Sequence, residues 1–204
     1  MKKGNLYLSL PILVLLLSGF GNENRNRSES LFFSEEISTV HTKENTFYRK
    51  KIPFLARDYN GFKEAVAFKE SQGKYHVVNG YGYLGKYQFG TSTLERLRIY
   101  QPDLFLKNPS LQEKAFAALC SLNKWILRKD IQRSVGKKIN GIDITESGIL
   151  AAAHLAGAGN VKKFLRSKGQ ESTKDAYNSS IEDYMKAFAY YDTSFIKATK
   201  KPAL

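Results

Sequence analysis

The stretch DYNGFKEAVAFKESQG, residues 58–73, has the pattern of one helix with a defined beginning and end. Asp58 or Asn60 can act as the N-cap, because their side-chain oxygens accept hydrogen bonds from the first free backbone N–H groups. Gly73 is typical of the position just beyond a helix C-terminus. Capping residues and apolar periodicity begin at Asp58, so we expect the folded domain to begin there.

An acidic residue lies on the apolar face of this predicted helix. Phe62, Val66 and Glu70 are spaced four residues apart, so they share one face. Partial burial and the negative end of the helix dipole both favour the protonated form of a carboxyl. A general acid must be protonated in this way near neutral pH. The alternative is that Glu70 turns outward and pairs with Lys69 or Lys74.

Downstream of this helix, capping residues and apolar periodicity predict mostly helices. Ser92 with Glu95 has the capping-box pattern, and Asn160 is typical of another N-cap. Residues 74–90 are rich in Tyr, Val and Gly and predict a short hairpin or Gly-rich loop. The fold class is therefore mainly α (α+β), with helices predicted at residues 93–100, 111–135, 146–159, 161–168 and 180–192.

The first 21 residues have the composition of a signal peptide. Lys2 and Lys3 precede an apolar run from Leu6 to Phe20, and Gly21 is a small residue of the kind that signal peptidase needs. We therefore expect export to the periplasm or cell envelope, or secretion; an uncleaved N-terminal anchor is the alternative. The predicted organisation is a signal peptide at 1–21, a linker or N-terminal extension at 22–57, one domain at 58–192 and a C-terminal tail at 193–204.

Composition restricts the class of partner. The chain of 204 residues has 32 basic and 19 acidic residues and a formal charge of +13, which suits an anionic partner such as a cell-envelope surface. The lysines are scattered, which argues against specific nucleic-acid binding. Cys120, the single cysteine, has apolar helical neighbours and predicts a buried, inert thiol. The histidines and Cys120 are too widely spread for a metal site. We expect no metal, no cofactor and a monomer.

Three motifs occur in order along the predicted domain: KESQG at 69–73, GYLGKYQFG at 82–90 and ILAAAHLAGAGNVKKFL at 149–165. Together they resemble the lysozyme-like lytic transglycosylases of the soluble type, close to glycoside hydrolase family 23. The resemblance covers residues 58–192. It implies a lysozyme-like helical domain with a small β-hairpin or Gly-rich loop beside a catalytic cleft. It also implies cleavage of peptidoglycan glycan strands between N-acetylmuramic acid and N-acetylglucosamine, which leaves 1,6-anhydro ends.

The resemblance implies a role for individual residues. Glu70 matches the family's catalytic glutamate. A tyrosine near that glutamate often comes from the C-terminal part of the domain, and Tyr184, Tyr190 and Tyr191 are all candidates. The third motif has His154-Leu155 where commoner members have Tyr-Asn. The residues expected to bind substrate are Ser71, Gly85, Tyr87, Gln88, His154, Tyr184 and Tyr190.

The residues themselves leave other interpretations open. Gln88 can equally be a solvent-facing loop residue, and His154 a core histidine on an apolar helix. Tyr81, Tyr83 and Tyr87 either line a saccharide groove or pack within a strand pair. We expect Gln112 to make a buried polar contact with the cleft wall.

No Asp or Glu lies between Glu70 and Glu95. Hydrolases of this kind usually need a second carboxylate, whereas a transglycosylase uses groups of the substrate in its place. A hydrolytic lysozyme using Glu146 or Asp143 is the second hypothesis, and a non-catalytic exported glycan-binding protein is the third. The sequence leaves open the product type, endo or exo action and the preference for stem peptides.

Overall fold

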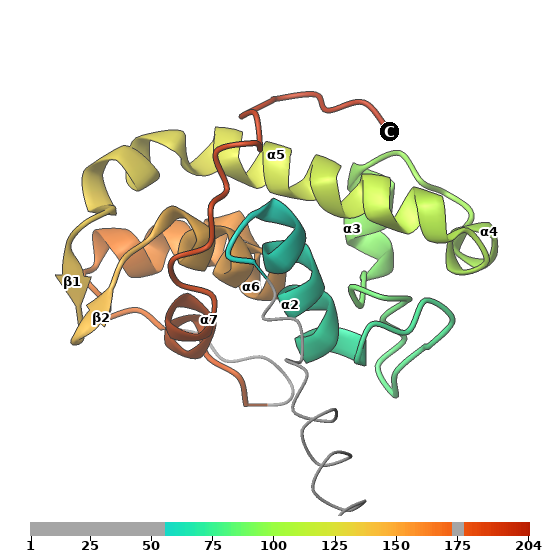
Figure 1. Cartoon of the computed structure of the whole chain (residues 1–204), viewed down its shortest axis with the longest axis horizontal. Helices are drawn as coiled ribbons and strands as arrows, with labels where there is room; N and C mark the ends of the chain where they lie inside the picture. The colour runs from blue at the N-terminus through green and yellow to red at the C-terminus, as the bar shows by residue number, and fades with distance from the viewer. Residues whose placement is uncertain (1–55, 173–177) are drawn as a thin grey trace, which may run out of the picture. The chain divides into compact units, whose positions relative to one another are not determined.

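The structure is a computed structural model that describes residues 56–172 and 178–204 (Figure 1). The predicted signal peptide at 1–21 and nearly all of the predicted linker at 22–57 lie outside these residues. Within the described residues, no helix combines the length and apolar character that a membrane crossing requires.

The domain is mainly helical, as predicted. Its core is a single cluster of apolar side chains to which the helices, the loop at 74–90 and the C-terminal segment all contribute. The long helix α5 packs along α6, and α6 also contacts α7. The elements are α2 (Tyr59–Ser71), α3 (Thr91–Arg96), α4 (Pro102–Leu106), α5 (Pro109–Ser134), β1 (Lys138–Ile139), β2 (Ile142–Asp143), α6 (Glu146–Arg166) and α7 (Ile181–Ala187).

Helix α2 begins and ends close to where the sequence predicts. The side chain of Asp58, rather than that of Asn60, is the N-cap and accepts a hydrogen bond from the N–H of Gly61 at 2.8 Å. At the other end, Gln72 has a φ of 58° and stops the helix one residue before Gly73. Phe62 is fully buried on this helix, so its apolar ridge faces the core as expected.

Two predicted helix starts are wrong. Helix α3 begins after Gly90, and Ser92 lies exposed within its first turn without capping it. Asn160 lies inside α6, where its side-chain amide donates to the carbonyl of Ala156 at 3.0 Å. The interruption falls instead at Gly157, whose φ of 78° and ψ of 149° are not helical. Glycine adopts such positive φ values without steric strain, which explains the break there.

The only paired strands among the described residues were not predicted. β1 and β2 pair antiparallel around Asn140-Gly141, whose φ values of 50° and 76° fit the tight turns that Asn-Gly favours. Residues 74–90 form a Gly-rich loop that has two isolated bridges, Val78 with Leu84 and Leu84 with Phe89. The sequence left a hairpin and a Gly-rich loop open for residues 74–90, and the structure shows the loop.

The segment after α7 packs against the domain. Ile196 is 5% exposed and belongs to the core cluster. The Lys124 ammonium donates to the carbonyl of Thr193 at 3.2 Å, and the N–H of Thr199 donates to the carbonyl of Ser121 at 3.1 Å. The first half of the predicted tail at 193–204 is therefore held against α5.

We expect the Cys120 thiol to react very slowly in the native protein. Its side chain is buried in α5, and burial raises the pKa of the thiol to about 12. Only the thiolate is nucleophilic, so the reactive form is scarce at neutral pH. Labelling with a maleimide should be complete in denaturant and nearly absent without it; rapid labelling of the native protein would contradict this expectation.

Candidate active site

A cavity of about 480 Å³ lies where the C-terminal end of α2 meets the Gly-rich loop, α3, α5 and α6. Three of the predicted site residues line it: Glu70, Gln88 and His154. The other predicted residues, Ser71, Gly85, Tyr87, Tyr184 and Tyr190, lie outside this lining. Sequence reasoning missed several polar lining residues, namely Asn79, Thr91, Thr93, Asn123 and Arg96.

Glu70 lies half-buried in the last turn of α2. Its Oε1 accepts a hydrogen bond from the Tyr184 hydroxyl at 2.7 Å. Tyr184 is 3% exposed on α7 and does not line the cavity, so a buried hydroxyl holds a carboxyl that itself lines the cavity. Of the three candidate tyrosines, Tyr184 is therefore the one that reaches the glutamate.

The other two candidates have different partners. The Tyr190 hydroxyl donates at 2.6 Å to Oδ2 of Asp143, the last residue of β2. The Tyr191 ring packs edge-on against Phe62, with ring centroids 5.9 Å apart.

Glu70 is the only Asp or Glu among the described residues that line the cavity. Glu146 accepts from Lys124 and from the Thr193 hydroxyl, both at 2.7 Å. Asp143 binds Tyr190 and lies 3.4 Å from Lys138. Neither carboxylate lines the cavity, so residues 56–172 and 178–204 place no second acid beside Glu70 within it.

The Gly-rich loop is held in place by a fully buried amide. Gln112 Oε1 accepts from the backbone N–H of Lys86 at 2.8 Å, and its amide donates to the carbonyl of Tyr75 at 3.0 Å. Gly85 has a φ of 73°, and a Cβ there would lie 2.2 Å from Gln112 Oε1. A side chain at Gly85 would therefore clash with the amide that fixes the loop. The loop then presents Gln88 to the cavity.

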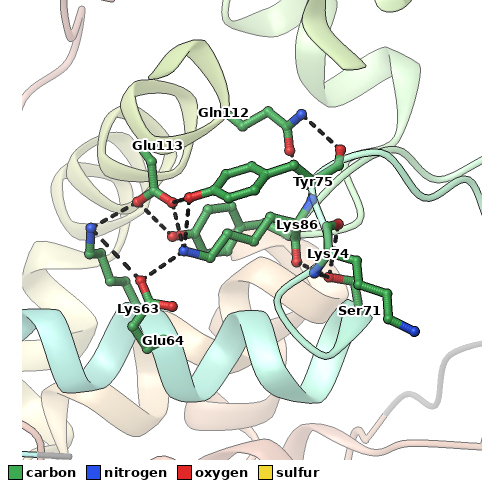
Figure 2. Close-up of polar contacts among 9 residues, drawn as sticks. Lys63, Glu64, Ser71, Lys74, Tyr75, Lys86, Gln112 and Glu113 are labelled. Carbon is green, nitrogen blue, oxygen red and sulfur yellow. Dashed lines mark hydrogen bonds and ion pairs between the residues drawn. The ribbon is translucent and has the colours of Figure 1, made fainter. Parts of the chain in front are cut away.

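Ser71 connects this loop to the end of α2 (Figure 2). Its hydroxyl donates to the carbonyl of Lys86 at 2.7 Å, and its oxygen accepts from the N–H of Lys74 at 3.0 Å. Because Ser71 follows Glu70 directly, the same hydrogen bonds fix the helix end that bears the carboxyl. Ser71 positions the site from behind the cavity wall.

Behind the loop lies a cluster of six charged and phenolic residues, here called the Glu113 cluster (Figure 2). Glu113 Oε1 accepts from Lys86 and from the Tyr75 hydroxyl, both at 2.7 Å. The second oxygen of Glu113 accepts from Lys63 at 2.8 Å and from Tyr87 at 2.9 Å. Lys86 also donates to Glu64 at 2.7 Å. The cluster joins α2, the Gly-rich loop and α5.

Opposite charges set the protonation states of this cluster. Burial raises the pKa of Glu113, but hydrogen bonds from Lys63, Lys86 and the two tyrosines outweigh it and bring the pKa down to about 2. Burial likewise lowers the pKa of Lys86, but hydrogen bonds to Glu113 and Glu64 outweigh it, and the net pKa lies above the usual range. Burial first, then the charge of Glu113, raises the pKa of Tyr87. At neutral pH Glu113 is therefore ionised and Lys86 is charged.

The depressed pKa of Glu113 predicts that the protein loses stability in acid. The pKa lies at about 2 in the folded protein and at 4.5 ordinarily, so the contribution is complete above pH 4.5 and is lost as the pH falls toward 2. The difference between these two pKa values corresponds to about 3 kcal/mol of unfolding free energy. Urea titrations between pH 7 and pH 2 should show this loss in the wild type and a smaller one in Glu113→Gln. If the unfolding free energy fell equally with pH in both proteins, Glu113 would not be the cause of the acid sensitivity.

His154 is mainly a core residue with one edge at the cavity. Its Nε2 lies 2.8 Å from the carbonyl of Tyr87, which can only accept, so Nε2 must be protonated. The ring packs edge-on against Phe89 and Phe116, with centroids 5.7 and 5.4 Å away. Nδ1 is buried and has no hydrogen-bond partner among the described residues. Tyr87, fully buried and stacked on Phe116, is also a core residue rather than a groove residue.

The chain was compared with protein-family models, with curated proteins and with solved structures. None of them matches it. The functional interpretation therefore depends on the chemistry of the cavity.

The cavity combines few charges with exposed aromatic rings. Besides Glu70, the lining contains a single guanidinium, that of Arg96 on α3. Tyr81 is 61% exposed and Tyr83 is 43% exposed, and both line the cavity. Aromatic faces pack against the apolar faces of sugar rings, and amide side chains such as Asn79 and Gln88 hydrogen-bond to hydroxyl and acetamido groups. One carboxyl in this setting can give a proton and later take one back.

Proposed function

We propose that this protein is a lysozyme-like lytic transglycosylase of peptidoglycan. It cleaves the β-1,4 bond between N-acetylmuramic acid and N-acetylglucosamine with Glu70 as the single acid and base. The observation that supports this function most is a cavity lined by amides and tyrosines in which Glu70 is the one carboxyl that the described part of the chain provides. The mainly helical fold and the Gly-rich loop beside the cavity agree with the architecture expected for this class.

The proposed reaction uses one carboxyl twice. Glu70 first donates its proton to the glycosidic oxygen as the bond to C1 breaks, and the carbonyl oxygen of the substrate's own N-acetyl group bonds to C1. The carboxylate then takes the proton of the 6-hydroxyl as O6 attacks C1 and displaces the acetamido oxygen. The product is a 1,6-anhydro sugar, and no water is consumed. Tyr184 orients the carboxyl through its 2.7 Å hydrogen bond in both steps.

A hydrolytic lysozyme on the same bond is the alternative that shares this chemistry. It needs a second carboxylate about 5–10 Å from the first to act as nucleophile or to activate water. Glu146 and Asp143 are bound to other residues and lie outside the cavity lining, which favours the transglycosylase. Since peptidoglycan lies outside the cytoplasm, the proposal requires export, which is also the prediction from residues 1–21.

Product analysis tests the proposal directly. Purified peptidoglycan is incubated with the protein, and the soluble fragments are analysed by mass spectrometry before and after borohydride reduction. Anhydro ends are lighter than hydrolytic products by one water and resist reduction, whereas the reducing ends of a hydrolase do not. A zymogram without a clearing zone, together with retained glycan binding, would instead support the non-catalytic hypothesis.

We expect Tyr184→Phe to lower kcat by about tenfold to a hundredfold, because the Glu70 carboxyl loses the hydroxyl that orients it, and a small misplacement of a reacting group can cost about a hundredfold in rate. The ring and its packing stay, so the melting temperature should change little. Tyr190→Phe is the matched control, because its hydroxyl binds Asp143 outside the cavity, and we expect its kcat to equal that of the wild type. Equal losses in the two variants would show that Tyr184 has no special role.

A further inference from the structure

A second hollow, of about 780 Å³, lies at the other end of α5 and α6. Helix α5 contributes to the lining of both, and its two nearest lining residues, Asn123 in the first cavity and Asp130 in the second, are about 10 Å apart at the usual helical rise. The second hollow contains five cationic side chains and one carboxylate. Its lining comprises Asp130, Arg133, Ser134, Lys137, Lys138, Ile139, Asn140, Leu165, Arg166 and Lys168.

The carboxylate fixes two of the cations. Asp130 is 2% exposed, and its Oδ1 accepts from Arg133 at 2.6 Å and from Arg166 at 3.0 Å. Burial raises the pKa of Asp130, but the two arginines outweigh it, so the net pKa lies below its usual range. Each guanidinium uses one nitrogen in these contacts, and the two arginine side chains are 57% and 58% exposed. Their remaining N–H groups are therefore held in place beside the hollow and accessible from solvent.

The lysines come from two turns that are fixed against each other. Asn140, in the turn between β1 and β2, donates to the carbonyl of Gly169 at 3.2 Å. A Cβ on Gly169 would lie 2.4 Å from the same amide, so the two turns are in close contact. This contact brings Lys138 and Lys168 together, so that both line the same hollow. Lys137 and Lys168 form no ion pair with any described residue, and Lys138 lies 3.4 Å from Asp143 at an exposed position.

Helix ends account for only part of this charge. Cations in the last turn of a helix interact favourably with its dipole, which explains Arg133 on α5 and Arg166 on α6. Lys137, Lys138 and Lys168 lie beyond those helix ends. Clustered like charges repel one another unless an anion neutralises them.

We infer that this hollow is a binding site for a phosphate-bearing anion. A phosphate group offers several acceptor oxygens to converging donors, and guanidinium groups pair with it in bidentate geometry while lysines add point charges. The site is separate from the Glu70 cavity and does not depend on the proposed catalytic function. An anionic polymer with repeated phosphates would bind here while a glycan occupies the other cavity.

The test uses the full-length protein and inorganic tripolyphosphate as the probe, with citrate as a carboxylate of similar charge. Binding is measured by isothermal titration calorimetry and located by chemical-shift changes. We expect tripolyphosphate to bind more tightly than citrate and to shift amide signals at 130–140 and 165–169. The double variant Lys137→Gln/Lys168→Gln should raise Kd at least tenfold, because neither lysine has an internal ion-pair partner among the described residues. Its activity on peptidoglycan fragments should stay at the wild-type level.

The matched control is Lys107→Gln/Lys114→Gln, which removes two exposed positive charges outside the hollow. We expect its Kd to stay within twofold of the wild type. An equal rise in Kd in both double variants would show that binding depends only on net charge, and would overturn the proposal of a specific site. Absence of binding by the wild type, or shifts spread over the whole surface, would also overturn it. Binding of citrate as tight as that of tripolyphosphate would overturn the assignment to phosphate.

Discussion

Glu70→Gln should abolish cleavage of peptidoglycan while the protein stays folded. Glutamine has nearly the same shape, and its amide oxygen can still accept the hydrogen bond from Tyr184. It cannot deliver a proton, however, and general acid–base catalysis contributes about 100- to 10,000-fold to the rate. Because Glu70 is the single acid that the described residues bring to the cavity, we expect a loss at least that large, measured as released muropeptides per unit time.

Glu146→Gln and Asp143→Asn are the controls for this prediction. Both remove a carboxylate that lies outside the cavity lining, so we expect each variant to keep most of its activity. A loss at either position that matched the loss at Glu70 would favour a hydrolase with two carboxylates. Near wild-type activity of Glu70→Gln would exclude Glu70 as the catalytic acid and with it the proposed function.

Glu113→Leu should destabilise the domain by about 3 kcal/mol, the lower end of the range for removing one partner of a buried ion pair, because the Lys86 side chain is 5% exposed but that of Glu113 is 25% exposed. Leucine is similar in volume, but it leaves Tyr75 and Tyr87 without their acceptor, and it leaves Lys86 with Glu64 as its remaining carboxylate partner. The melting temperature should fall by about 10 °C or more. Activity should fall as well, because Lys86 belongs to the loop that presents Gln88 to the cavity. Calorimetry and the muropeptide assay measure the two effects.

Two further variants separate charge from packing in the Glu113 cluster. Lys69→Ala removes an exposed cation from the same helix, α2, and should change the melting temperature by only a few degrees. Lys86→Met together with Glu113→Leu removes both central charges. This double variant should recover part of the stability, because the buried Lys86 ammonium is no longer left without the carboxylate of Glu113. If Glu113→Leu were as stable as Lys69→Ala, the cluster would contribute little to the fold.

Much of the helical framework could be predicted because its determinants are local. Asp58 caps α2 through a side chain three residues from its partner, and the apolar spacing of α5 indicates which residues are buried. The start of α3 was predicted wrongly because two residues near it could act as the N-cap. Ser92 had a capping-box pattern, but Gly90 already had the extended backbone of an N-cap. The strands β1 and β2 are only two residues long, yet Asn140-Gly141 was a turn signal that could have revealed them.

The site was predictable in part. Glu70 could be found because its place on an apolar ridge is visible in the spacing of residues along one helix. The Glu113 cluster was not predicted, because its members come from α2, the Gly-rich loop and α5, and no local pattern reports such long-range contacts. Lys86 looks like an ordinary loop lysine in the sequence, but it is 4% exposed in the fold. The choice of Tyr184 over Tyr190 likewise depended on tertiary packing.

The hydrogen bond from Ser71 to the carbonyl of Lys86 closes the chain into a loop around residues 72–85. Closing a loop reduces the conformational freedom of every residue within it, and small extracellular domains often achieve this with a disulfide. This chain has a single cysteine, which is buried in α5 and cannot form an intrachain disulfide, so the loop is closed by a hydrogen bond instead of a covalent link. The closure needs no oxidant and no isomerase. The geometry around Glu70 is therefore independent of the redox state of the compartment in which the protein folds.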